Sequence, residues 1–169
     1  MSNSAELKIR EEWDLLKTSG LLSQIGCTAG PQKIREKGTK NSYNLFKWNA
    51  IMRGPKNSPY NGYLFKFEIN FPLDYPNNRP KVISKDKDMY HMNISTSGNV
   101  CVSSITSNEG WGRAQDISTV LLSIFIIFSK PNPDSPYRSD IAQLYKTDKK
   151  KYEEKVKEEC AKFALKIPE

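Results

Sequence analysis

The chain has 169 residues and a formal net charge of +7. This length is enough to bury a sizeable core, and we expect one domain over residues 1–169 with its core at about 5–166. The three cysteines are widely spaced and odd in number, which argues against a disulfide framework and for a reducing compartment, the cytoplasm or the nucleus. A single histidine argues against a zinc site, and the polar N-terminus has no apolar signal-peptide core.

The positive charge is distributed unevenly along the chain. Residues 1–85 hold 14 lysines and arginines against 7 acidic residues, whereas residues 86–169 hold 12 of each. No aromatic-basic platform and no zinc-finger spacing accompany this excess, so we expect no nucleic-acid partner. An acidic protein partner and a merely solvated basic surface both remain open.

The first 42 residues predict a helix, a strand and a loop. Asn3 or Ser4 can cap a helix that runs to about Lys17. Its apolar residues recur at helical spacing on one face: Ile9, Trp13 and Leu16. A short strand is predicted over residues 22–28, and the polar residues 31–42 predict an exposed loop.

From Leu45 the pattern changes to the period of two that is typical of strands. A first strand places alternate apolar residues on one face: Phe46, Trp48, Ala50 and Met52. After a turn region a second strand does the same: Tyr63, Phe65, Phe67, Ile69 and Phe71. Prolines at 72, 76 and 80 then force an extended passage into a last short strand around residues 82–83.

The last third of the chain predicts helices. Residues 117–128 are apolar nearly all round and shorter than the roughly 20 residues that cross a bilayer, so we expect a buried central helix and no membrane partner. A short helix is predicted over residues 139–145, and Asp148 can cap a final one. The final helix carries an apolar stripe: Tyr152, Val156, Cys160 and Phe163. This order of elements predicts an α+β domain with a mostly antiparallel sheet.

Residues 90–102 lie in an irregular stretch between the last strand and the central helix, where functional loops are common. A thiol is nucleophilic only as a thiolate, so a reactive Cys101 needs partial exposure and neighbours that can handle developing charge. The amide of Asn93 can donate to an oxyanion if a turn at residues 97–98 folds it back toward Cys101. The alternative is that Cys101 is a small buried apolar residue between two valines.

From about Ala5 to Phe163 the sequence resembles the ubiquitin-conjugating enzymes. The motifs that carry the resemblance follow one another in that family's order: Cys27-Thr28-Ala29-Gly30-Pro31, Trp48, Ile51-Met52-Arg53-Gly54-Pro55, Ser58-Pro59-Tyr60, Phe71-Pro72-Leu73-Asp74-Tyr75-Pro76, His91-Met92-Asn93, Cys101, Trp111, Ala114, Pro131-Asn132-Pro133-Asp134-Ser135-Pro136 and Tyr145-Lys146-Thr147-Asp148. The family's fold has a four-stranded antiparallel sheet, an N-terminal helix, a central buried helix and two C-terminal helices, and we expect the same here.

The resemblance implies a role for each residue of the cysteine stretch. Cys101 would accept ubiquitin from an activating enzyme as a thioester and yield it to a substrate lysine or to a ligase. Asn93 would stabilise the oxyanion or brace the loop. His91 would be structural, hydrogen-bonding the backbone, together with Tyr90 and Gly98.

A further position concerns the incoming lysine, which must lose a proton with an unperturbed pKa of about 10.4. The family places an acid or a serine beside the cysteine, and the matching residue here is Ser135. Because serine brings no charge, we expect slower transfer to lysine than in a relative with aspartate there. The alternative for Ser135 is a simple turn at the end of the helix.

The resemblance also implies contact surfaces. Leu122 matches a position that packs against the donor ubiquitin, and its alternative is simple core. The residues implied in docking the activating enzyme and ligases are Lys8, Arg10, Pro76, Asn77, Arg113 and Ala114. Asn77 and Arg113 replace the phenylalanine and the proline of the best-known members, which puts the usual ligases in doubt. Met92 replaces the signature proline and predicts a less rigid loop.

We expect no cofactor, because the activating enzyme and not this chain uses ATP. The expected partners are ubiquitin, the activating enzyme, ubiquitin ligases and substrate proteins. Two alternatives remain: conjugation of another modifier, SUMO or NEDD8, and a non-catalytic domain that only binds ubiquitin. The step from Cys101 to Trp111 is reminiscent of the SUMO-conjugating enzyme, whereas residues 27–31 and 131–148 favour ubiquitin.

Overall fold

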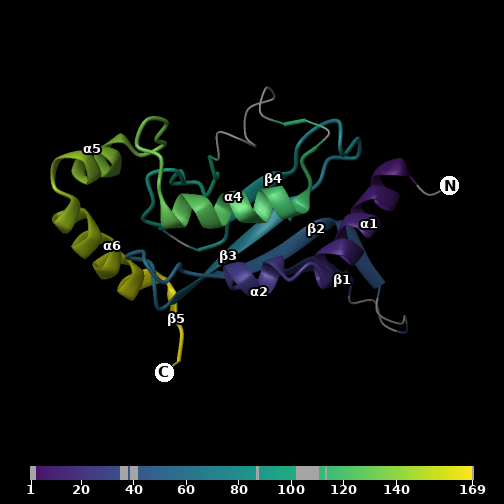
Figure 1. The fold of residues 1–169 in the computed structure, drawn as a ribbon, viewed down its shortest axis with the longest axis horizontal. Helices are drawn as coiled ribbons and strands as arrows, with labels where there is room; N and C mark the ends of the chain where they lie inside the picture. The colour runs from purple at the N-terminus through teal and green to yellow at the C-terminus, as the bar shows by residue number, and fades with distance from the viewer. Residues whose placement is uncertain are drawn as a thin grey trace.

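The computed structural model describes residues 3–34, 38, 42–86, 88–101, 111–112 and 114–168. Its helices are α1 (Ser4–Thr18), α2 (Leu21–Ile25), α4 (Ile117–Ser129), α5 (Ser139–Thr147) and α6 (Lys149–Phe163). Its strands are β1 (Cys27–Ile34), β2 (Ser42–Arg53), β3 (Tyr63–Asn70), β4 (Lys81–Ser84) and β5 (Leu165–Lys166). α4 crosses the sheet, with α1 at one end of the molecule and α5 and α6 at the other (Figure 1).

The sheet has the order β1-β2-β3-β4, and every pairing is antiparallel. The predicted α+β architecture with four antiparallel strands is therefore confirmed. The predicted alternation is confirmed from Trp48 to Met52, where the apolar residues of β2 lie opposite those of β3 in register: Trp48 with Ile69, Ala50 with Phe67, and Met52 with Phe65. It is wrong at Phe46, which is only partly buried, because Leu45 takes the buried place before Trp48. The two-residue strand β5 was not expected, and it pairs with the start of β3.

Two predictions for the N-terminal third are wrong. Residues 21–25 form the short helix α2 instead of a strand, because Gly20 and Gly26 adopt left-handed φ angles of 77° and 62° that delimit one helical turn. The strand begins only at Cys27 and continues to Ile34, through the first part of the predicted loop. A register shift between Pro31 and Gln32 lets the strand carry the proline. Residues 35–37 and 39–41 of that loop lie outside the described residues.

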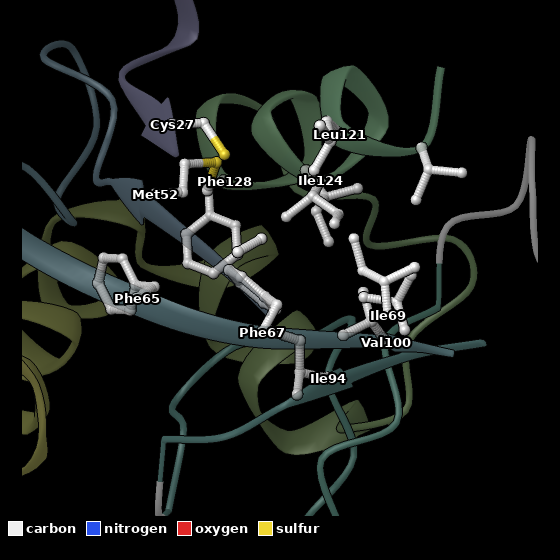
Figure 2. Packing of buried hydrophobic residues seen from close by; sticks show 14 of the residues in the cluster. Cys27, Met52, Phe65, Phe67, Ile69, Ile94, Val100, Leu121, Ile124 and Phe128 are labelled. Atoms are coloured by element: carbon white, nitrogen blue, oxygen red, sulfur yellow. The ribbon is translucent and has the colours of Figure 1, made fainter. Parts of the chain in front are cut away.

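The core lies between α4 and the sheet. Figure 2 shows Leu121, Ile124 and Phe128 of α4 facing the apolar side chains of β3. Ile94 and Val100, from the segment that contains Cys101, are buried in the same cluster. The irregular stretch is thus anchored by the core on which the sheet and α4 pack.

The two predicted N-terminal helix caps, Asn3 and Asp148, are confirmed. The Asn3 side chain accepts a hydrogen bond from the Ala5 amide at the start of α1, and the Asp148 side chain accepts one from Lys151 at the start of α6. The stripe of α6 is buried at Tyr152, Val156 and Cys160. Within the described part of the chain, none of the helices is both long and apolar enough to cross a membrane.

Each end of α4 is held by a buried side chain from elsewhere in the chain. At its N-terminal end, Glu12 of α1 accepts hydrogen bonds from the Ile117 amide at 3.0 Å and from the Tyr75 hydroxyl at 2.7 Å. At its C-terminal end, His91 Nε2 lies 3.0 Å from the Ile127 carbonyl oxygen. These contacts fix α4 relative to α1, to the turn that contains Tyr75 and to the segment that precedes Cys101.

Candidate active site

The cysteine loop, residues 90–101, folds back on itself as a short hairpin. Ile94 and Val100 form an antiparallel bridge, and the Ser95 amide donates to the Asn99 carbonyl at 2.9 Å. At the open end of the hairpin, the Cys101 amide donates to the Asn93 carbonyl at 2.8 Å. The predicted turn at residues 97–98 therefore does bring Asn93 beside Cys101.

Gly98 fixes this hairpin to the sheet. Its φ of 90° is left-handed, and a Cβ atom there would lie 2.7 Å from the Ser84 carbonyl oxygen. The Ser84 amide in turn donates to the Gly98 carbonyl at 2.7 Å. Glycine is required at this position both by the backbone conformation and by the close approach of β4.

The side chain of Asn93 is directed toward the segment that follows α4, and it is only 2% exposed. Its Nδ2 donates to the Asn132 carbonyl at 2.8 Å and, more weakly, to the Ser135 carbonyl at 3.4 Å. Its Oδ1 accepts from the Asn132 amide at 2.9 Å. In this arrangement the amide of Asn93 braces the loop, and its two N–H groups are already directed at backbone oxygens.

His91 has the contacts of a structural residue. Its Nδ1 accepts from the Asn93 amide at 3.0 Å, so its Nε2 carries the proton and donates to the Ile127 carbonyl. Complete burial lowers the pKa of His91 to about 4, which keeps the ring neutral. The ring stacks on Tyr60, whose hydroxyl donates to the Tyr90 carbonyl at 2.8 Å.

Met92 takes the place of a proline without leaving the loop loose. Its side chain is fully buried, and its carbonyl oxygen accepts hydrogen bonds from the amides of Tyr137 at 2.9 Å and Arg138 at 3.1 Å. The less rigid loop that was predicted from the missing ring is therefore countered by packing and by two backbone hydrogen bonds.

The three cysteines lie in different surroundings. Cys27 and Cys160 are buried, and loss of solvent raises the pKa of each thiol to about 12. Cys101 is only partly buried, at the end of the hairpin. The alternative that Cys101 is an ordinary buried apolar residue does not fit this position, whereas it does fit Cys27 and Cys160.

Most of the predicted docking residues lie on segments that contact one another. The indole N–H of Trp111 donates to the Pro76 carbonyl at 2.8 Å, which joins the turn of Pro76 and Asn77 to the segment that carries Ala114. The Asn3 side chain at the start of α1 donates to the Leu73 carbonyl of the same turn at 3.3 Å. We call these segments the docking surface, after the role that was predicted for their residues. Arg113 lies outside the described residues.

The cations of α1 are less available than expected. Lys8 Nζ lies 3.7 Å from Glu12 Oε1, and Arg10 Nη2 lies 3.5 Å from Glu6 Oε1. Both basic side chains are still about half exposed. Exposed ion pairs of this kind are weak, so an acidic partner can exchange them at small cost.

The central helix is not buried all round. Leu122 is 39% exposed and Ile126, one turn later, is 50% exposed. The alternative that Leu122 is simple core is therefore wrong. Ser135 is exposed as well, and its backbone carbonyl is the weaker acceptor of the Asn93 amide.

The sequence reasoning missed Glu12. Glu12 is 5% exposed and connects α1, the turn of the docking surface and α4. A signal was present, since Glu12 is three residues after Ile9 and four before Leu16, on the apolar face of α1. Among the residues that the structure describes, no cluster of histidine, cysteine, aspartate or glutamate could hold a metal ion.

The family model described as ubiquitin-conjugating enzyme matches residues 24–160. The match spans β1 to β4, the cysteine loop, α4, α5 and α6 nearly to its end. It thus covers the site built above together with the elements that position it. The chain belongs to the ubiquitin-conjugating enzyme family, whose members conjugate ubiquitin or a ubiquitin-like modifier.

Proposed function

We propose that this chain carries ubiquitin as a thioester on Cys101 and transfers it to a substrate lysine or to a ligase cysteine. The observation that supports this most directly is the contrast among the cysteines. Cys101 is partly exposed at the end of a braced hairpin, whereas Cys27 and Cys160 are buried with raised pKa. Only Cys101 combines access with a fixed backbone.

The proposed reaction has two exchanges at one carbonyl carbon. The Cys101 thiolate attacks the thioester that joins ubiquitin to the activating enzyme, the new C–S bond forms, and the activating-enzyme thiolate leaves. An amine nitrogen then attacks the new thioester, loses a proton, and the Cys101 thiolate leaves. A thioester is already activated, so the chain needs to orient the acyl group and to support the oxyanion, without a dedicated base at the cysteine.

The proposed role of Asn93 is to hold the loop. Its amide already donates to two backbone carbonyls, and the 3.4 Å contact with Ser135 is the weaker one. To stabilise the oxyanion it would first have to release one of these acceptors. His91 supports the same bracing through its two backbone contacts and contributes no proton at neutral pH.

The proposed partners follow from the exposed surfaces. The activating enzyme docks on α1, ligases dock on the docking surface, and the donor ubiquitin packs on Leu122 of α4. The activating enzyme uses the ATP, and the chain itself takes no cofactor. The proposed location is the cytoplasm or the nucleus, where thiols stay reduced.

The direct test is a charging assay. The chain is incubated with ATP and matched activating enzymes for ubiquitin, SUMO or NEDD8, and adducts are separated with and without a reducing agent. We expect a reducing-agent-sensitive adduct with ubiquitin that Cys101→Ala abolishes. Cys101→Ser should give an ester that resists the reducing agent, because an oxygen ester does not exchange with thiols.

The matched controls are Cys27→Ala and Cys160→Ala, which should keep the adduct if they fold. An adduct that survives in Cys101→Ala would refute the assignment of the nucleophile. If the chain formed an adduct with SUMO or NEDD8 and none with ubiquitin, that modifier would take the place of ubiquitin in the proposed function. No adduct with any modifier, from a folded chain, would favour a domain that only binds ubiquitin.

Ser135 supplies a second test at the same site. We expect Ser135→Asp, or phosphorylation of Ser135, to speed discharge of the charged chain to free lysine, because a negative charge favours the approach and deprotonation of the amine. The control is Ser139→Asp, which adds the same charge at an exposed serine at the start of α5. A Ser135→Asp chain that discharges no faster than the parent would contradict the proposal.

A further inference from the structure

Two clefts lie at the C-terminal end of α4, and their lining residues come from α2, the turn after β2, α4, α5, α6 and the segment after β5. The larger has a volume of about 640 Å³ and lies between α2, the turn after β2 and α4. The smaller has a volume of about 290 Å³ and lies between α4 and the start of α6. Asn57 and Ser129 line both clefts, so the clefts adjoin, and we call the two together the furrow.

The furrow is lined by four cations: Arg53, Lys56, Lys130 and Lys149. Among the described residues that line it, the only acidic one is Glu153, in the smaller cleft. All four cations are exposed, and none of them takes part in the ion pairs formed among the described residues. By contrast, the cations of α1 all have an acidic neighbour on the same helix.

The rest of the lining suits a peptide chain. Gln24, Asn57 and Asn61 provide amide groups that can donate to and accept from a peptide backbone. Phe125 and Ile167 provide apolar contact within the larger cleft. Both clefts fall in or near the size range of pockets that hold a few residues of a ligand.

We propose that this furrow binds an acidic, extended peptide segment of a partner protein. Carboxylates of the segment would pair with the four cations, and apolar side chains between them would enter the larger cleft. A nucleic acid fits less well, because the aromatic rings of the lining, Phe125 and Tyr145, pack against the core, and Lys149 lies over the ring of Tyr145.

One end of the furrow is next to the active site in the sequence. Pro131 lines the smaller cleft, and the next residue, Asn132, is the one that holds the Asn93 side chain. A bound segment would therefore place its protein near the cysteine loop, and none of the predicted docking residues lines the furrow. The binding itself does not depend on the proposed thioester chemistry and is tested separately from it.

The test measures fluorescence anisotropy with a short labelled peptide that alternates glutamate with leucine. A peptide with glutamine in place of glutamate is the ligand control. We expect saturable binding of the acidic peptide that weakens as salt is raised. The double variant Lys56→Glu with Lys130→Glu should weaken it by about tenfold or more, because attraction becomes repulsion in the middle of the furrow.

The matched variant is Lys81→Glu with Lys157→Glu, which reverses two exposed lysines that lie outside the furrow and outside the ion pairs of the described residues. It should bind as the parent does, and both double variants should keep the parent's circular dichroism and thermal midpoint. Equal loss in the two double variants, or equal binding of the glutamine peptide, would overturn the proposal. So would displacement of the peptide by a single-stranded oligonucleotide or an anionic lipid vesicle that binds more tightly.

Discussion

The two ends of α4 are fastened by opposite chemistry. At the N-terminal end a carboxyl group, Glu12, accepts the Ile117 amide, and Asp116 adds a reciprocal cap with Thr119. At the C-terminal end a neutral imidazole, His91, donates to the Ile127 carbonyl, and the cations of the furrow lie around it on the surface. Each arrangement complements the partial charge of its helix end, positive at the start and negative at the finish.

The difference shows how burial acts on an acid and on a base. Burial raises the pKa of Glu12 and lowers that of His91 to about 4, so both groups resist their charged form. The stability contributed by His91 is present above its unfolded pKa of about 6.5 and is lost as the pH falls toward 4. The stability contributed by protonated Glu12 is present below its unfolded pKa and is lost as the pH rises through its raised folded pKa.

The largest effect is expected at the C-terminal end. His91→Ala removes a fully buried ring and leaves the Asn93 amide and the Ile127 carbonyl without their partner, which should lower the free energy of unfolding by about 3–5 kcal/mol. Urea denaturation measures this loss. His91→Gln, which keeps a donor and an acceptor, should lose less, and a loss below about 1 kcal/mol for alanine would contradict the bracing role.

Lowering the pH should reduce the stability that the His91 contacts give to the parent protein. Because the pKa of His91 falls from 6.5 to about 4 on folding, its share of the stability, about 3 kcal/mol, should disappear between pH 6.5 and 4. The profile of His91→Gln is subtracted to remove the carboxyl groups that titrate in this range. If the free energy of unfolding depended on pH in the same way in the parent and in His91→Gln, the lowered pKa of His91 would be refuted.

The second largest loss of stability is expected from replacing Glu12 at the N-terminal end of α4. Glu12→Ala leaves the Tyr75 hydroxyl and the Ile117 amide without an acceptor, so we expect a loss of about 2–3 kcal/mol in urea denaturation. The control, Glu11→Ala, changes the exposed neighbour on the same helix and should stay within about 0.5 kcal/mol of the parent. Equal losses at both positions would show that the loss does not come from the bonds of Glu12.

The smallest effect is expected from Glu12→Gln. Glutamine keeps an acceptor for Tyr75 and Ile117 but cannot ionise, so the variant should gain stability relative to the parent as the pH rises above the usual glutamate range. Thermal midpoints of both proteins across that range measure the difference. Lys8, which lies 3.7 Å from Glu12, acts in the opposite direction, and Lys8→Met should enlarge the difference.

These contacts explain which features could be predicted from the sequence. Caps at Asn3 and Asp148, the alternation in β2 and β3 and the turn at residues 97–98 are local, and local chemistry determined them. α2 was missed because a segment of five residues is too short for its periodicity to separate helix from strand. The hydrogen bonds of Glu12 join residues 63 and 105 positions apart, and the furrow is lined by five segments that are distant in the sequence, so only the folded chain reveals them.

Met92 gives the cysteine loop an intrinsic reporter. A proline at this position would have neither an amide hydrogen nor a terminal methyl group, whereas methionine has both. Because the Met92 side chain is fully buried and its own carbonyl oxygen accepts from the amides of Tyr137 and Arg138, its methyl resonance in an NMR spectrum senses the packing of the loop directly. Events at the cysteine, and at the furrow nearby, can therefore be followed at a natural residue without attaching a probe.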